Sequence, residues 1–394
     1  MVAVSTALLQ FKPKFPKLGI ILKKLSEKQR LRHKRLMQKR LKSQTIRFSA
    51  SEGHGQAIEA RNRFRTARRL LPKIHMDFER RPGYATFLPP KLFSLSENYE
   101  ETLSFIYDFK IHFSRRKPLI CEDGVSRQTY AEFSEIETLG SGAGLVLAAE
   151  IHRYSQTRPG KIKVQDHQWA EGVRNYFIDT GLFNLLRIDP HEIQARSRIS
   201  EKREALRYQS GRTLEGKDVA ELRRRLQELA GQPVGKRVLV YNAIAEAFKN
   251  VDHAYPRWFR SWPYPSSHRW WTSGFWEPSS KTVGLQLYDQ GAGIPRTLPR
   301  QSQWPRLLRL MEPERSDSGL IAAAMEYGRT STGQQGRGKG LAEMADWIES
   351  SGSGFLRILS GQGEVTYRPG RIITRRDFDA NFDGTLVQWE LSLA

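Results

Sequence analysis

The chain has 394 residues, of which 39% are hydrophobic and 27% charged, and it carries a formal net charge of +22. This composition is typical of soluble globular domains, and the length predicts two or three of them. The sequence has no run of about 18 apolar residues and one cysteine, Cys121, which excludes a membrane-spanning helix, an internal disulfide framework and a thiolate zinc site. We therefore expect a cytoplasmic protein without a membrane partner.

The positive charge is concentrated in an N-terminal arm. Residues 1–50 hold 14 Lys or Arg against one acid, Glu27. Residues 25–43 contain helix formers and no helix breaker, but a helix there would be basic nearly all round and unstable alone. The arm predicts contact with nucleic acid or another acidic partner through residues 1–70, or a solvated tail.

A linker and a first domain follow the arm. Residues 72–95 hold four prolines and a glycine, so residues 1–95 are expected to be arm and linker. The next block, 96–200, alternates predicted helices and strands, which indicates a small α/β domain. Its expected elements are a helix in ENYEETLSFIYDFKIHF, a strand, Gly-rich turn and helix in AEFSEIETLGSGAGLVLAAEIHRYSQ, a strand in GKIKVQD and a helix in WAEGVRNYFIDTGLFNLLRI.

A second domain is predicted over residues 215–394. Apolar periodicity predicts helices in DVAELRRRLQELAG, VLVYNAIAEAFKNVDHAYP and GLAEMADWIESSG, and alternation predicts a strand in VGLQLYDQ. Three or four strands are expected in FLRILSG, GEVTYRP, RIITR and GTLVQWELSL, with SGQG, residues 360–363, as a hairpin turn. This order predicts an α+β layer with helices on one face of a mostly antiparallel sheet. The Trp-rich insert 255–280 is expected to be a satellite core, or a surface for a partner or single-stranded nucleic acid.

Two polar residues share one face of a predicted helix in the second domain. Glu246 and Asn250 are four residues apart, which is about one helical turn. An Asn amide oxygen is a hard ligand of the kind that Mg²⁺ accepts together with waters and substrate phosphates. A Glu one turn earlier could polarise a water molecule. Alone, the pair is better explained by a polar helix face.

The segment DQGAGIP, residues 289–295, directly follows the predicted strand. Asp289, at the strand end, could accept a hydrogen bond from an exocyclic amine. Gly291 and Gly293 would let the backbone turn tightly beneath a flat ring. Alone, this segment is equally explained by a turn that requires its glycines.

The segment GQQGRGKGL, residues 333–341, resembles a P-loop, but Gly340 stands where that loop needs Ser or Thr. The preceding MEYGRTSTGQQ is polar and loop-like, whereas a P-loop follows a buried strand. A helix is expected directly after the segment, and backbone N–H groups at a helix N-terminus bind phosphate. Arg337 and Lys339 could add positive charge. We therefore interpret the segment as a phosphate loop of another kind.

Taken in order, these segments resemble the ATP-binding domain of the GHKL superfamily, which includes DNA gyrase, a heat-shock chaperone, histidine kinases and the mismatch-repair ATPase. EAFKNVDHAY resembles its N box, DQGAGIP its G1 box, GRGKGL its G2 box and GTLVQWEL its closing strand. Each motif is short, but all four occur in the family's order. The resemblance implies a GHKL-type α/β sandwich that binds ATP and Mg²⁺.

The resemblance also implies roles for individual residues. Asn250 would bind Mg²⁺, Asp289 would accept from the adenine amino group, and Glu246 would be the general base if ATP is hydrolysed. Residues 296–335 would form a mobile ATP lid. The remaining implied contacts are Gly291, Gly293 and Thr385 with adenine, and Gly336, Arg337, Gly338, Lys339 and Gly340 with the phosphates.

The block 96–200 has a weaker resemblance to STAS-type domains, the anti-sigma-antagonist fold. The resemblance rests on YAEFSEIETLGSGAGLVLAAEIHRY and TGLFNLLRI. Those domains often place a phosphorylatable Ser in a strand-to-helix turn. Here Gly142 holds the expected position, and the nearby hydroxyls of Ser141 and Ser134 do not match it. A binding module without that switch is therefore an alternative.

Three functions agree with these patterns. The first is an ATP-binding, slowly hydrolysing regulatory protein, in which Mg-ATP orders the lid and switches a surface offered to a protein partner. The second is a Ser/Thr protein kinase of the anti-sigma type that uses the same site. The third is a nucleic-acid-associated protein that binds through its basic arm and uses ATP as a switch.

Overall fold

The computed structural model describes residues 69–393, apart from residue 74 and the stretches 115–118, 121–123, 158–163, 190–203, 213–215, 256–266, 301–306, 308–315 and 331–339. The predicted basic arm therefore lies outside the described residues, except at its C-terminal edge. All the described residues belong to one unit that is defined by its internal contacts, residues 57–394. None of the helices in this part of the chain is long and apolar enough to cross a membrane.

Five antiparallel strands form the central sheet, and their order is β10-β11-β9-β8-β7. The prediction of a mixed α+β fold is confirmed at this level. The strand predicted in VGLQLYDQ is the central strand β9, in which Leu285 and Leu287 face one core cluster and Tyr288 faces another. The strands are β7 (Glu204–Gly211), β8 (Trp270–Glu277), β9 (Thr282–Asp289), β10 (Phe355–Arg368) and β11 (Arg371–Ser392).

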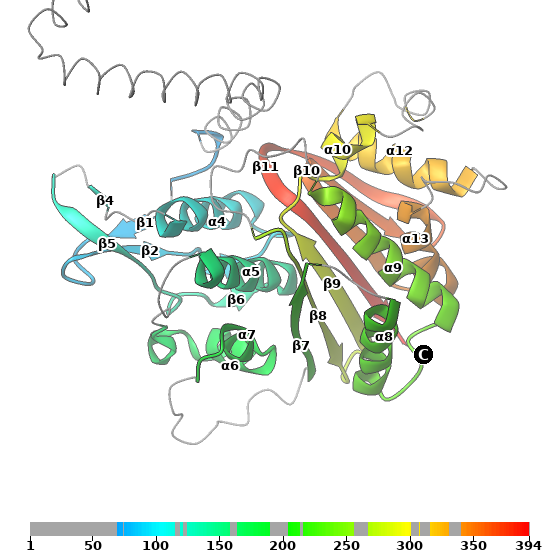
Figure 1. The fold of residues 1–394 in the computed structure, drawn as a ribbon, viewed down its shortest axis with the longest axis horizontal. Coiled ribbons are helices and arrows are strands. Elements are labelled where there is room, and N and C mark those ends of the chain that lie inside the picture. Colours follow the sequence, from blue (N-terminus) through cyan, green and yellow to red (C-terminus); the bar gives the residue numbers. More distant parts are fainter. Residues whose placement is uncertain are drawn as a thin grey trace, which may run out of the picture. The chain divides into compact units, whose positions relative to one another are not determined.

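Helices from the C-terminal half cover one face of this sheet (Figure 1). The buried residues of α8 are Val219, Leu222, Leu226 and Ala230, which recur with the predicted helical period. The Trp347 ring lies 5.7 Å from that of Trp389 on β11. The four main helices of this layer are α8 (Gly216–Ala230), α9 (Arg237–Ala254), α12 (Asp317–Thr330) and α13 (Gly340–Ser351).

Helices from the N-terminal half cover the other face, on the opposite side of the sheet in Figure 1. Residues of α4 (Tyr99–Ser114) and α5 (Ser141–Thr157) share a core cluster with Trp271, Tyr288 and Leu386 of the sheet. The helices of residues 215–394 thus lie on one face of the sheet, as predicted, and the preceding block covers the second face, which was not predicted. Because β8, β9 and β11 carry large apolar side chains on both faces, each face requires its own apolar layer.

The remaining N-terminal elements form two small sheets. The strands β1 (His75–Asp77), β2 (Tyr84–Leu88), β5 (Ser126–Ala131) and β4 (Leu119–Ile120) form a mixed sheet in the order β1-β2-β5-β4. The strands β3 (Leu92–Phe93) and β6 (Thr138–Leu139) pair in parallel. The helices are η1 (Asp166–Gln168), α6 (Glu171–Asp179) and α7 (Leu182–Leu186).

Three of these strands lie in residues 72–95, where a linker was predicted. Ala85, Phe87 and Phe93 are fully buried, so this stretch belongs to the folded core. Its prolines stand outside the strands, where their missing N–H groups interrupt no ladder. The prediction of a linker is therefore corrected.

The Trp-rich insert also differs from its prediction. WWTSGFWE forms β8, a strand inside the central sheet, and Trp271 is fully buried. An exposed platform and a satellite core are both excluded for this stretch. Trp258 and Trp262 lie outside the described residues.

The C-terminal strands form one long hairpin, β10 with β11. SGQG, the predicted turn, lies within β10. The pairing of β10 with β11 shifts its register there, at Gly361, whose φ is +65°. There the Gln362 N–H donates to Asp317 at the start of α12, at 2.8 Å. The chain turns instead between Arg368 and Arg371.

The predicted lid, residues 296–335, contains a core helix. α12 buries Ile321 and Met325 in the same cluster as β10. Its sequence, DSGLIAAAMEYGRT, combines helix formers with an apolar face, which is typical of a packed helix. The expectation that the whole stretch is a loop is therefore wrong, while residues 301–306, 308–315 and 331–335 lie outside the described residues.

A network of buried charges joins α4 and α5 to the sheet. Lys110 Nζ lies 3.4 Å from Glu150 Oε1 and 3.7 Å from Asp383 Oδ2. Arg153 Nε donates to Glu150 Oε2 at 2.8 Å. Lys110, Glu150 and Arg153 are all at most 1% exposed. Because an unpaired buried charge is strongly destabilising, each member of this network depends on the others.

We predict that Lys110→Met lowers the free energy of unfolding by about 3 kcal/mol or more, because Glu150 and Asp383 lose a shared cation. Chemical denaturation of the full chain measures this change. The matched control is Lys91→Met, which breaks the ion pair between Lys91 and Glu137. These two side chains are 67% and 68% exposed, so the control should change the free energy of unfolding little. Equal effects of the two substitutions would contradict the importance of the buried network.

Candidate functional site

The end of β9 presents a buried carboxylate. Asp289 is the last residue of the strand and is 2% exposed. Its Cα partners on the neighbouring strands are Thr385 of β11 and Trp270 of β8. Because directly opposed residues of an antiparallel pair point to the same face, the Thr385 and Asp289 side chains lie side by side. The structure thus brings together two of the four residues that were predicted to contact an adenine ring.

Burial controls the electrostatics of Asp289. The Gly291 N–H donates to its Oδ1 at 2.6 Å. Desolvation raises the pKa of Asp289 to about 7, and the Gly291 hydrogen bond acts in the opposite direction. A carboxylate has about four acceptor positions, so Asp289 retains capacity for a donor from a bound molecule. Its protonation state can change near neutral pH.

The glycines after Asp289 hold the following loop close to α9. A Cβ atom on Gly291 would lie 2.6 Å from Asp289 Oδ1 and 2.7 Å from the Ala254 carbonyl oxygen. The Ala292 N–H donates to that same carbonyl at 2.6 Å. Gly293 has a φ of +85°, which side chains disfavour, and it precedes α10 (Ile294–Thr297). Gly291 is therefore required because the loop lies so close to α9, and Gly293 is required because of its positive φ.

Four residues that sequence reasoning missed fix this loop. The Gln290 N–H donates to the Tyr255 hydroxyl at 2.8 Å, and Gln290 Nε2 donates to Glu150 Oε1 at 2.7 Å. The Ile294 N–H donates to Ser360 Oγ at 2.9 Å. Tyr255 ends EAFKNVDHAY and Gln290 lies within DQGAGIP, so both were inside the recognised segments. Their partners are distant in the sequence, which concealed their roles.

The face of α9 carries the other predicted residues. Glu246 Oε1 accepts a hydrogen bond from Lys249 Nζ. Asn250 Nδ2 is buried and has no hydrogen-bond partner within the described residues. Gly340, the first residue of α13, is so close that a Cβ atom there would lie 2.7 Å from Glu246 Oε2. The structure thus brings Glu246 and Gly340 together.

Glu246, Asn250 and Ala254 form one row along α9, because they follow at intervals of one helical turn. Gly340 lies at the Glu246 end of this row, and Gly291 lies at the Ala254 end. With a rise of 1.5 Å per residue, the row is roughly 12 Å long. The two glycine segments therefore mark the ends of an elongated site rather than one point.

Four predicted residues cannot be placed. Gly336, Arg337, Gly338 and Lys339 lie outside the described residues. Gly340 is the described end of that segment, and its closeness to Glu246 places the end of the segment beside α9.

The described residues contain no group of three or more His, Cys, Asp or Glu side chains that could hold a metal ion. A metal at this site would therefore take most of its ligands from a bound molecule and from water, as Mg²⁺ commonly does. Rotation of an amide exchanges its oxygen and nitrogen, so Asn250 can turn its oxygen toward such an ion. The Asn250 atom without a partner is Nδ2, so only the rotated amide, with its oxygen in that position, would supply a protein ligand.

Comparison with known protein families and with curated proteins finds no match for this chain.

We predict that Gly291→Ala lowers the free energy of unfolding by about 1–3 kcal/mol, because its Cβ atom meets the end of α9 and the Asp289 carboxylate. Thermal or chemical denaturation measures the change. Gly172→Ala, in α6, is the matched control, because a Cβ atom there meets no atom within 4 Å. The control should be neutral or stabilising by up to about 1 kcal/mol. A neutral Gly291→Ala would refute the close approach.

Proposed function

We propose that this chain is an ATP-binding regulatory protein with a GHKL-type nucleotide site. The observation that carries the proposal is the position of Asp289. It is a buried carboxylate at the end of the central strand, beside Thr385, with no room for a side chain at Gly291. An adenine amino group would supply a further donor to the carboxylate, and the flat ring would lie against the glycine backbone.

In this proposal, the row on α9 aligns the nucleotide. Adenine lies at the Asp289 end, with Thr385, Gly291 and Gly293, and the phosphates lie at the Gly340 end. The segment from Gly336 to Lys339 would complete the phosphate contacts. Asn250 lies between the two ends and would hold Mg²⁺, which neutralises phosphate charge when it is bound. Glu246, beside Gly340, would orient and deprotonate a water molecule in slow hydrolysis.

The N-terminal half supports a regulatory role for this site. Gln290 follows the proposed adenine-binding residue directly, and it donates to Glu150 of α5 at 2.7 Å. A nucleotide that shifts the loop after β9 would therefore change the packing of α5, which offers a route to a protein partner. The STAS-like character of residues 96–200 belongs to the same proposal, with this region as the partner-binding module.

We predict that Asp289→Asn weakens binding of both Mg-ATP and metal-free ADP by about tenfold or more, because the amide gives up a charged acceptor. Asn250→Ala should weaken Mg-ATP by a similar factor and metal-free ADP much less, because its role is at the metal. Isothermal titration calorimetry with the full chain separates the two effects.

The control for this experiment is Asn184→Ala, an exposed residue of the same type on α7, which should bind as the wild type does. Glu246→Gln should retain Mg-ATP binding and lose phosphate release. If neither Asp289→Asn nor Asn250→Ala weakens Mg-ATP binding, the assignment of the site is wrong.

The pKa of Asp289 predicts a pH dependence of adenosine binding. The ionised carboxylate accepts the amino hydrogen better than the protonated form, and this carboxyl ionises as pH rises through about 7. Adenosine affinity should therefore increase from about pH 6 to about pH 8, by up to about tenfold per pH unit below the pKa, with proton release on binding. Calorimetry in buffers of different ionisation enthalpy detects the proton. The Asp289→Asn variant should bind adenosine weakly, and its affinity should not change with pH. If its affinity still changes with pH, another group is responsible for the pH dependence.

A further inference from the structure

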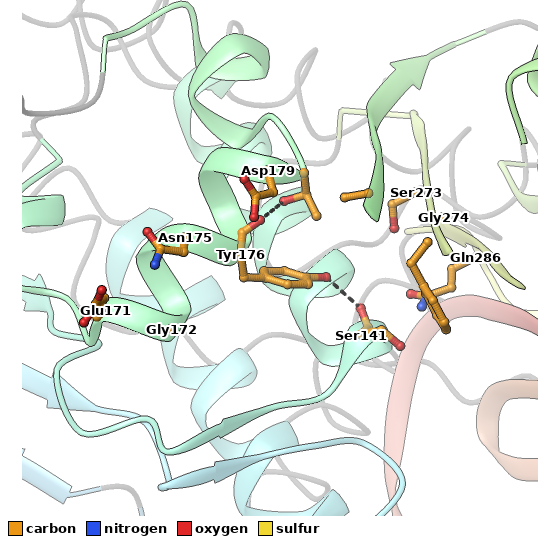
Figure 2. A pocket seen from close by; sticks show the side chains of 12 residues that line it. Ser141, Glu171, Gly172, Asn175, Tyr176, Asp179, Ser273, Gly274 and Gln286 are labelled. Carbon is orange, nitrogen blue, oxygen red and sulfur yellow. Dashed lines mark hydrogen bonds between the residues drawn. The ribbon is translucent and has the colours of Figure 1, made fainter. Parts of the chain in front are cut away.

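A cavity lies between the N-terminal helices and the central sheet, on the opposite face of the sheet from the Asp289 side chain. Its volume is about 380 Å³, within the range of small-molecule sites. Figure 2 shows Tyr176 of α6 on the helix side of the cavity, and Ser273 of β8 and Gln286 of β9 on the sheet side. The proposed nucleotide site uses none of its described lining residues.

The sheet side of the cavity carries a buried amide with an unsatisfied oxygen. Gln286 is 2% exposed, and its Oε1 has no hydrogen-bond partner within the described residues. Its Cα partners are Ser273 and, on β11, Gln388, so the three side chains point to the same face. Gln388 Oε1 accepts from Arg357 Nη1 at 2.8 Å, whereas the Gln286 oxygen, in the same part of the chain, lacks a donor. A bound donor would remove the cost of this buried oxygen.

Two aromatic rings line the cavity, and each is held in place. The Tyr176 hydroxyl donates to the Ser141 carbonyl at 3.4 Å, as Figure 2 shows, and it accepts from the Tyr208 hydroxyl at 3.3 Å. Phe275 of β8 supplies the second ring, and a Cβ atom on Gly284 would overlap it, so this ring lies directly against β9. A flat apolar group packs well against fixed aromatic rings.

The amide of Gln286 selects the polar edge of a flat ligand. A primary amide presents an acceptor oxygen beside N–H donors in one plane, and it pairs best with an edge that has a donor beside an acceptor. An open-chain secondary amide is trans, so its N–H and C=O groups point in opposite directions. A small ring holds an amide in the cis form, with both groups on one edge. A lactam, which is a cyclic amide, therefore matches Gln286.

We propose that this cavity binds a small planar lactam that is conjugated with an aromatic ring. The aromatic part packs against Tyr176 and Phe275. The lactam N–H donates to Gln286 Oε1, and the lactam carbonyl accepts from Gln286 Nε2. This proposal is independent of the nucleotide site, because the two sites share no described residue.

The test compares four uncharged probes with the full chain by ligand-observed NMR, so charges near the cavity do not affect the ranking. Quinolin-2-one has a lactam N–H beside its carbonyl. 1-Methylquinolin-2-one lacks the N–H, indole lacks the carbonyl, and acetanilide carries both groups on opposite sides of a trans amide. Quinolin-2-one should show saturable binding at millimolar concentration. The other three probes should bind about two- to tenfold more weakly, because each loses at least one hydrogen bond.

Two variants separate the amide contact from the ring contact. Gln286→Leu should remain folded, because it replaces an amide whose oxygen is unsatisfied with an apolar group. It should weaken quinolin-2-one binding by roughly tenfold and abolish its advantage over 1-methylquinolin-2-one. Tyr176→Leu should weaken all four probes by a similar factor of about two- to tenfold and keep their order, because it removes an aromatic wall.

The matched control is Gln209→Leu, the same substitution at a half-buried residue of β7 that is not among the described lining residues. It should bind quinolin-2-one as the wild type does, and so should Asp289→Asn, which tests the nucleotide site separately. The proposal is overturned if quinolin-2-one shows no saturable binding, if another probe binds equally well, or if Gln286→Leu keeps the wild-type order of the probes. Loss of binding in Asp289→Asn would place the probe in the nucleotide site and would also overturn the proposal.

Discussion

The arrangement of the N-terminal and C-terminal halves depends on the interactions of one fully buried carboxylate, that of Glu150. Its Oε2 accepts from Arg153, and its Oε1 accepts from Gln290 and lies 3.4 Å from Lys110. It thereby connects α5 to α4 and to the loop after β9. Because Gln290 follows Asp289, the same carboxylate also positions the end of the central strand. The proposed adenine contact is thus supported from a helix of the opposite layer.

Elements with a strong period could be predicted from sequence, and those defined by distant contacts could not. The period of Leu222 and Leu226 and the alternation of Leu285 and Leu287 indicated α8 and β9, because one face of each is apolar. β8 was missed because it is apolar on both faces, which leaves no alternation to read. The strands between residues 72 and 95 were missed because prolines at their ends resembled a linker.

The candidate site was accessible from sequence where its residues are close along the chain. Glu246 and Asn250 share a helix face, and Asp289 and Gly291 belong to one turn, so short spacing was sufficient. Thr385 was identified only through the resemblance, and strand pairing places it beside Asp289. The Gln290–Glu150 hydrogen bond joins residues 140 positions apart, which no local pattern reports. Gln286 looked like an ordinary polar position of an alternating strand, and only the second layer makes it buried.

The two-sided burial of the central sheet also limits how the chain can be divided. Trp271, Tyr288 and Leu386 of the sheet pack in one cluster with α4 and α5. A fragment that starts near residue 204 would keep every strand of the sheet but would expose this aromatic face to water. Such a surface favours aggregation over a monomeric fragment. The residues before and after position 200 therefore form two layers of a single folding unit, although the sequence predicted two separate domains.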